Sequence, residues 1–154
     1  MNRKIYVNTR PSPYVEEIVV GGHTLLADEP SEIGGMDAGP NPYELLLAAL
    51  GTCTCITVRM YAERKHWLLE AVQVTLTHAK VHAEDCVACE TEAKSLDQIE
   101  VEISLTGDLS GEQRQRLLAI AGKCPVHRTL TSQVRISTRT ARPLEVAPAS
   151  SGTP

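Results

Sequence analysis

The side chains in this sequence best suited to chemistry are its five cysteine thiols. Cys53 and Cys55 lie in an apolar-rich segment, Cys86 and Cys89 form a C-x-x-C pair in an acidic segment, and Cys124 stands immediately before a proline. The thiolate is the form of cysteine that acts as a nucleophile and as a metal ligand. The five thiols therefore predict redox chemistry or metal binding, unless they only fill space in the core.

Cys124 has the sequence context of a stabilised thiolate. Because Pro125 suits the first turn of a helix, Cys124 is predicted at an N-cap, where free backbone N–H groups favour negative charge. His127 and Arg128 follow closely and can add positive charge. An ordinary residue at a helix end is an equally good interpretation of this pattern alone.

Cys53 is predicted to lie in the middle of a helix with apolar neighbours. It comes eleven residues after Pro42, too far for the helix dipole to act on it, so a reactive thiolate there would need a nearby cation or hydrogen-bond donor. The residues that share its helix face are mostly apolar: Leu46, Ala49, Leu50, Ile56, Thr57 and Met60. On the evidence of this helix alone, Cys53 is more simply a small core residue. Cys55 faces nearly the opposite side, which indicates packing.

The acidic segment, residues 82–98, contains half of a usual zinc site. One C-x-x-C pair supplies two ligands, and a histidine and a carboxylate could complete four: His82, Cys86, Cys89, and Asp85 or Glu90. Three interpretations remain open: a zinc site, a pair of exposed reduced thiols, and an auxiliary dithiol that relays reducing equivalents.

The hydrophobic pattern predicts the elements that must position these thiols. A helix from Pro42 to near Lys65 is apolar on every side and should be buried. Alternating residues predict strands at 3–8, 71–81, 99–105 and 134–137, and a hairpin at 14–27 with a Gly21-Gly22 turn. A capping-box pattern at Ser110 predicts a further helix to about Lys123.

This order of elements indicates an α+β fold with mainly antiparallel sheets around a long buried central helix. One sheet can cover only one side of that helix. We therefore expect a second copy of the chain to cover the other side, in a homodimer.

Composition and charge restrict the partners. The 154 residues fit one domain, predicted at 1–139, followed by a tail at 140–154 whose Ala, Pro, Ser and Gly content predicts disorder. A net charge of -4 without a basic stripe argues against nucleic acid as a partner. Polar residues interrupt the apolar helix too often for a membrane span, and the N-terminus lacks the apolar region of a signal peptide. A cytoplasmic location with reduced thiols is expected.

Two segments together resemble a known family. GPNPYELLLAALGTC (residues 39–53) and KCPVHRTL (residues 123–130) are similar to the two cysteine motifs of the OsmC/Ohr family, the osmotically inducible protein C and organic hydroperoxide resistance proteins. The likeness covers roughly residues 14–138, includes the order of the elements, and is closest to an OsmC-like branch. It implies an intertwined homodimer with active sites at the subunit interface.

The resemblance also implies a function: a thiol-dependent peroxidase that reduces organic hydroperoxides in oxidative-stress defence. Carried over by position, Cys53 is the peroxidatic thiol, which becomes a sulfenic acid, and Cys124 is the resolving thiol, which closes a disulfide. The reductant is expected to be a dithiol such as dihydrolipoamide or a lipoylated protein. No cofactor is required, and zinc would concern only Cys86 and Cys89. The apolar surroundings of Cys53 favour small hydrophobic hydroperoxides over hydrogen peroxide.

The sequence departs from the hydroperoxide resistance branch within the first motif. In that branch a glutamate follows Asn-Pro and pairs with an arginine near the reactive thiol, whereas here Tyr43 takes that position. The candidates for supporting the thiolate are Glu44, Arg10, Arg128 and His127, with Arg59 as a further arginine. The competing hypothesis is a non-catalytic protein that binds an apolar ligand or senses redox state, with a metal at Cys86 and Cys89.

Overall fold

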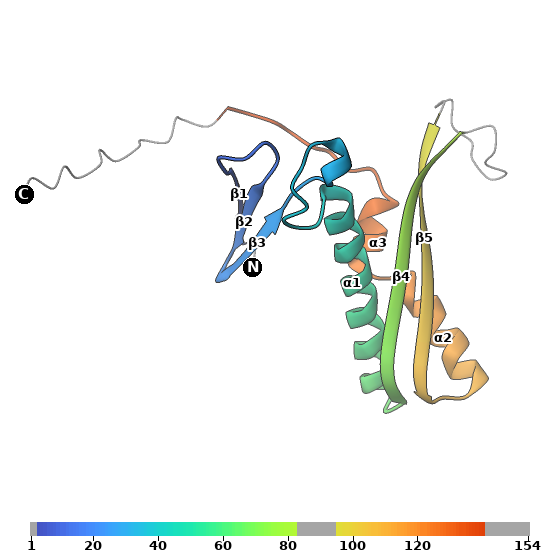
Figure 1. Cartoon of the computed structure of the whole chain (residues 1–154). Helices are drawn as coiled ribbons and strands as arrows, with labels where there is room; N and C mark the ends of the chain where they lie inside the picture. Colours follow the sequence, from blue (N-terminus) through green and yellow to red (C-terminus); the bar gives the residue numbers. More distant parts are fainter. Residues whose placement is uncertain (1–2, 83–94, 141–154) are drawn as a thin grey trace, which may run out of the picture.

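The chain forms an α+β domain (Figure 1), and the computed structural model describes residues 3–82 and 95–140. The elements in order are β1 (Ile5–Thr9), β2 (Glu16–Val20), β3 (His23–Ala27), the 3-10 turn η1 (Ser31–Ile33), α1 (Pro42–Arg64), β4 (Leu68–His82), β5 (Ser95–Asp108), α2 (Gly111–Ala121) and α3 (Pro125–Leu130). The strands pair antiparallel in two sheets, β1-β2-β3 and β4-β5. The predicted fold class, with its long central helix, is confirmed.

Each of the two longer helices starts with a capping box that is visible in the local sequence. At the start of α1 the Asn41 side chain accepts the Glu44 N–H at 3.0 Å, and the Glu44 carboxylate accepts the Asn41 N–H at 2.8 Å. This capping box satisfies N–H groups that the helix itself leaves free. Ser110 and Gln113 form the same arrangement before α2, as the sequence predicted.

One side of α1 is buried against the β4–β5 pair and α2. Its buried residues recur every three or four positions, as expected for one helix face: Leu50, Gly51, Thr54, Val58 and Ala62. The helix lies close to β4, since a Cβ added at Gly51 would be 2.8 Å from Leu76 Cδ1. Val58 and Leu117 are wholly buried at the centre of the core, with Ile103 and Leu105 of β5 packed against it.

The opposite side of α1 is apolar and exposed in the single chain. Ile56 is 58% exposed and Met60 63%. By length and composition alone α1 could cross a membrane, yet its buried side packs as the central helix of a folded domain. Burial of one side of the helix is therefore shown, and the expected cover of the other side by a second copy stays a prediction.

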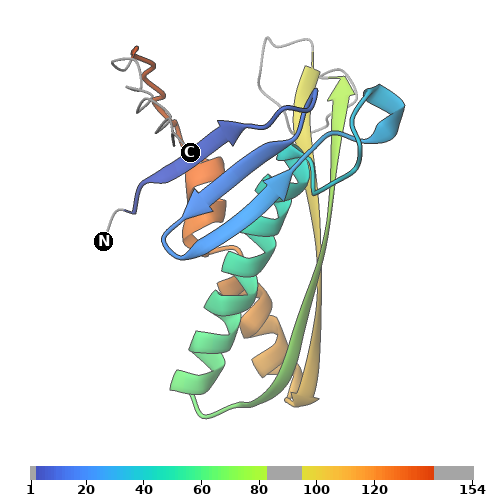
Figure 2. The ribbon, with the colours of Figure 1, turned by 60° about the vertical axis from the view of Figure 1, so that its left-hand side comes forward.

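The β1–β3 sheet is separate from the β4–β5 pair. Figures 1 and 2 place it beside the N-terminal half of α1. Loop residues 28–41 connect β3 to α1, and the buried Asp28 organises this connection. Its carboxylate accepts the backbone N–H groups of Glu29, Met36 and Ala38 at 2.8, 2.9 and 3.1 Å.

Two secondary-structure predictions need correction. β5 begins at Ser95, inside the segment predicted as a loop, because the pairs Lys80–Asp97 and Val81–Leu96 continue the ladder with β4. The strand predicted at 134–137 is not formed: residues 133–140 have no regular secondary structure, and Ile136 is 85% exposed. An alternating segment becomes a strand only beside a partner edge, and no described strand of this chain pairs with it. Of the predicted tail, residues 141–154 lie outside the described residues.

Candidate active site

The fold brings Cys53 and Cys124 together. Cys53 lies in the middle of α1, and Cys124 is the N-cap residue of α3. The Cys53 side chain lies close enough to Cys124 to help lower the pKa of that thiol. Cys53 is half-buried, whereas Cys124 is wholly buried. Of the two sulfurs, Cys53 is therefore the one that a molecule from solvent can reach first.

Cys124 caps α3 with its sulfur atom. The His127 N–H donates to Cys124 Sγ at 3.2 Å, and Pro125 occupies the first position of the helix. This is the N-cap position predicted from the Cys-Pro sequence. A second donor comes from α1, because the Thr54 hydroxyl lies 3.5 Å from Cys124 Sγ and is itself buried.

These donors favour the thiolate form of Cys124. Burial raises the pKa of this thiol, but hydrogen bonds from the Thr54 hydroxyl, the His127 N–H, the Cys53 thiol and the Val126 N–H act in the opposite direction. Together they outweigh burial, so the pKa of Cys124 lies below its ordinary value. Neutral hydrogen-bond donors where α1 and α3 meet thus stabilise the negative charge of the Cys124 thiolate.

The charged groups predicted to support a thiolate lie elsewhere in the single chain. Arg10 forms an ion pair with Glu17 of β2. Glu44 is engaged in the capping box of α1, nine residues before Cys53, which is about 13 Å along the helix axis. Arg128 is exposed. Its backbone N–H donates to the Cys124 carbonyl oxygen at 3.1 Å, which is a hydrogen bond of helix α3 and not a contact with the thiol. Of the four predicted supporters, the structure brings His127 alone to a thiol, through its backbone N–H.

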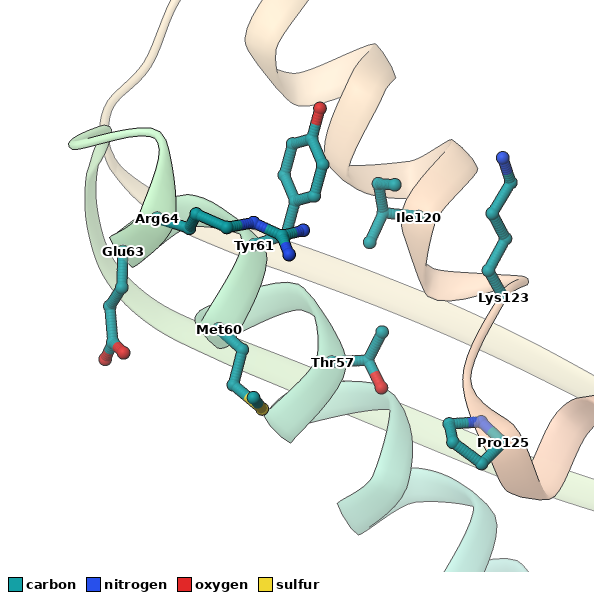
Figure 3. Close-up of a pocket in the computed structure, with 8 residues that line it drawn as sticks. All are labelled: Thr57, Met60, Tyr61, Glu63, Arg64, Ile120, Lys123 and Pro125. Carbon is teal, nitrogen blue, oxygen red and sulfur yellow. The ribbon is translucent and has the colours of Figure 1, made fainter.

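A pocket of about 640 Å³ lies between α1, α2 and α3 (Figure 3). Its walls are largely apolar and include Met60, Tyr61, Ile120 and Pro125. Thr57 also lines it and donates its hydroxyl to the Cys53 carbonyl oxygen at 2.8 Å, while Pro125 directly follows Cys124. The pocket therefore lies one helical turn from Cys53 and one residue from Cys124.

Comparison with known proteins gives the family of this chain. The sequence profile described as OsmC-like protein matches residues 34–139. The chain belongs to the OsmC-like family. This confirms the resemblance seen in the two cysteine motifs.

Solved structures give the same fold for this OsmC-like chain. An organic hydroperoxide resistance protein OsmC from Legionella pneumophila has a TM-score of 0.62 at 19% identity, over 85% of this chain and 90% of that one. An OsmC-like protein from Mycoplasma pneumoniae reaches 0.67 at 17% identity, over 84% and 87%. The organic hydroperoxide resistance protein OhrB of Bacillus subtilis reaches 0.58 at 15% identity, over 85% and 91%. The sequence has no significant match among curated proteins.

Tyr43 of the OsmC-like protein packs where the hydroperoxide resistance branch has its glutamate. The Tyr43 ring stacks on the His78 ring, with centroids 4.5 Å apart and planes at 17°. His78 Nε2 in turn lies 2.9 Å from Asp97 Oδ1. Tyr43 therefore anchors the start of α1 to the β4–β5 pair.

The predicted metal site remains a prediction. His82 ends β4, while Cys86 and Cys89 lie outside the described residues. Among residues 3–82 and 95–140 there is no group of three or more side chains that could hold a metal ion. Cys55 agrees with its predicted packing role, since its thiol faces β4 with Sγ 3.9 Å from the Val72 carbonyl oxygen.

The sequence patterns pointed neither to Thr54 at the site nor to Asp28 in the loop before α1. Thr54 counted only as a polar interruption of the apolar helix, although a hydroxyl adjacent to a candidate cysteine is itself a signal. Asp28 lay within a loop rich in Gly and Pro. Its burial could not be inferred, because the N–H donors that it binds are separated from it by up to ten residues.

Proposed function

We propose that this OsmC-like protein is a thiol-dependent peroxidase that reduces organic hydroperoxides in defence against oxidative stress. The observation that carries the proposal is the cysteine pair itself: a half-buried Cys53 next to a buried Cys124 whose pKa lies below its ordinary value, with an apolar pocket one helical turn away. Two of the similar solved structures are organic hydroperoxide resistance proteins, which supports the same reaction class.

The first step consumes the hydroperoxide at Cys53. The Cys53 proton passes to the neighbouring Cys124 thiolate, which leaves Cys53 as the nucleophile. The Cys53 thiolate attacks the peroxide oxygen that bears hydrogen and breaks the O–O bond, giving a sulfenic acid and an alkoxide. Cys124 returns the proton to the alkoxide, so that an alcohol leaves and the Cys124 thiolate is restored.

The second step closes the disulfide. The Cys124 thiolate attacks the sulfur of the Cys53 sulfenic acid, and hydroxide leaves and takes a proton from solvent to become water. A dithiol then reduces the Cys53–Cys124 disulfide by two thiol–disulfide exchanges and is itself oxidised to a disulfide. Dihydrolipoamide or a lipoylated protein fits this requirement, and no metal or organic cofactor enters the cycle.

The pocket supports a hydrophobic substrate. Its lining of Met60, Tyr61, Ile120 and Pro125 offers dispersion contacts to an alkyl or aryl group, which hydrogen peroxide lacks. We place the protein in the cytoplasm, where its thiols stay reduced between turnovers. We also propose that it acts as a homodimer, since the exposed apolar side of α1 borders the same pocket through Met60.

Stoichiometric oxidation tests the proposed function. The reduced protein is treated with cumene hydroperoxide or with hydrogen peroxide, and free thiols and the Cys53–Cys124 disulfide are followed by mass spectrometry. We expect fast disulfide formation with the organic peroxide and slower formation with hydrogen peroxide. Intact thiols under excess organic peroxide would refute the function.

Two variants and one control assign the roles of the thiols. Cys53→Ser should consume no peroxide. Cys124→Ser lacks both the proton acceptor and the resolving thiol, so it should react more slowly and stop at a sulfenic acid on Cys53. Cys55→Ala is the matched control, because Cys55 lies two residues along the same helix but faces β4. It should react at the unaltered rate.

A further inference from the structure

The hydroxyl of Thr54 lies beside Cys124, although Thr54 belongs to neither cysteine motif. Thr54 is 3% exposed, on the buried side of α1. Its Oγ1 lies 2.9 Å from the Leu50 carbonyl oxygen, as in many helical threonines, and 3.5 Å from Cys124 Sγ. The hydroxyl carries one proton and faces two acceptors, so its orientation depends on the charge of the sulfur.

Two hydrogen-bond arrangements are available at this point. When Cys124 is a thiol, its S–H can donate to Thr54 Oγ1 while the hydroxyl donates to the Leu50 carbonyl. When Cys124 is a thiolate, the hydroxyl turns and donates to Sγ instead. A bond to a charged acceptor is stronger than one to a neutral acceptor, so the hydroxyl favours the thiolate.

We propose that Thr54 is a further residue of the peroxidase reaction, which holds Cys124 in the form that closes the disulfide. The inference rests on the proposed function for its place in the cycle. The hydroxyl donates to Cys124 Sγ when Cys124 is a thiolate and to the Leu50 carbonyl when Cys124 is a thiol. It therefore has an acceptor in both states. Thr54 acts mainly on the second step. Loss of its hydroxyl lowers the population of the Cys124 thiolate but makes each thiolate a stronger acceptor for the Cys53 proton, so its two effects on the first step oppose each other.

Single-turnover oxidation of the full chain tests the inference. The variant Thr54→Val keeps the shape of the side chain and removes its hydroxyl, whereas Thr54→Ser keeps the hydroxyl. With cumene hydroperoxide and a sulfenic acid trap, we expect Thr54→Val to accumulate trapped Cys53 and to close the disulfide roughly tenfold more slowly near neutral pH. Thr54→Ser should restore closure.

The pH dependence of closure separates this role from a structural one. We expect the midpoint of the rate against pH to move upward in Thr54→Val and to return in Thr54→Ser, which a packing defect would not produce. Thr52→Val is the matched control, because Thr52 is exposed and its hydroxyl donates only to the carbonyls of Ala48 and Ala49. Closure in Thr54→Val at the unaltered rate and midpoint would overturn the inference.

A second measurement keeps the inference testable if the protein is not a peroxidase. The ultraviolet absorbance of the thiolate in the reduced, untreated chain, taken as the difference from the same chain carrying Cys124→Ser, reports the Cys124 thiolate without peroxide and without access of a reagent to its buried sulfur. An upward shift of its pH profile in Thr54→Val supports the role of the hydroxyl, and an unchanged profile refutes it. Failure of the oxidation assay in the unaltered protein would refute only the proposed function.

Discussion

Cys124 combines a structural and a chemical role, and two substitutions should separate them. Its sulfur accepts the His127 N–H at 3.2 Å and so caps α3, besides serving as the proposed resolving thiol. Serine keeps an acceptor at the N-cap with the His127 N–H and the Thr54 hydroxyl as partners, whereas alanine keeps none. Loss of an N-cap acceptor costs about 1 kcal/mol.

Burial adds to the cost of the alanine variant. Cys124 is 0% exposed, so removal of its sulfur also leaves a small cavity, as in other large-to-small core substitutions. We expect Cys124→Ala to be less stable than Cys124→Ser by about 1–2 kcal/mol in total. Both variants should lose the disulfide, because neither has a thiol at this position.

Urea unfolding of the reduced variants measures this difference. For a chain of this size, each 1 kcal/mol corresponds to a shift of about 3 °C in Tm, which thermal unfolding can verify. Cys53→Ser and Cys53→Ala form the control pair, since Cys53 lies inside α1 and caps nothing. Equal stability of the two Cys124 variants, or a less stable serine variant, would refute the capping argument.

Three further predictions concern the fold around the site. Burial raises the pKa of Asp28, but three backbone hydrogen bonds outweigh it and lower the pKa. The carboxylate therefore contributes stability that is present above the unfolded pKa of about 3.9 and lost as pH falls through the lower folded value. Urea midpoints of the unaltered chain and Asp28→Asn should differ at neutral pH and converge in acid; a constant difference would contradict this. Leu117→Ala removes a wholly buried side chain and should cost about 2–5 kcal/mol in urea unfolding, while a loss below 1 kcal/mol would place Leu117 outside the core. Ile56→Glu should convert the proposed homodimer to a folded monomer in sedimentation velocity, and an unaltered dimer would place the interface elsewhere.

Elements with strong local signals could be predicted from the sequence. The capping box at Ser110 and the Cys124-Pro125 pair each begin a helix where expected. Alternating residues likewise predicted β4 and β5, because one face of that pair packs on α1 and α2 while the other does not. Strand ends were less predictable: the ladder continues through polar residues to Ser95, where no hydrophobic pattern remains.

The contacts of the site depend on how distant segments cross, which local patterns do not encode. The sequence supplied Cys53 and Cys124 as candidates, but only the crossing of α1 and α3 places one sulfur beside the other. For the same reason the presence of an arginine in the sequence did not predict a cation beside the thiols. Arg10 carries the right charge but forms an ion pair with Glu17 in a sheet that lies apart from the β4–β5 pair.

The packing of α1 explains why a thiol and a hydroxyl meet at Cys124. Thr54 occupies the buried stripe between Leu50 and Val58, so the contact that builds the core also directs its hydroxyl toward α3. Cys53 precedes it by one residue, which rotates its side chain by about 100° to the edge of that stripe. Thr54 is therefore buried and Cys53 is only half-buried. A polar threonine in the stripe is tolerated because both of its partners are acceptors at hydrogen-bond distance. These two acceptors offset the cost of burying the hydroxyl, and the same hydroxyl lowers the pKa of Cys124.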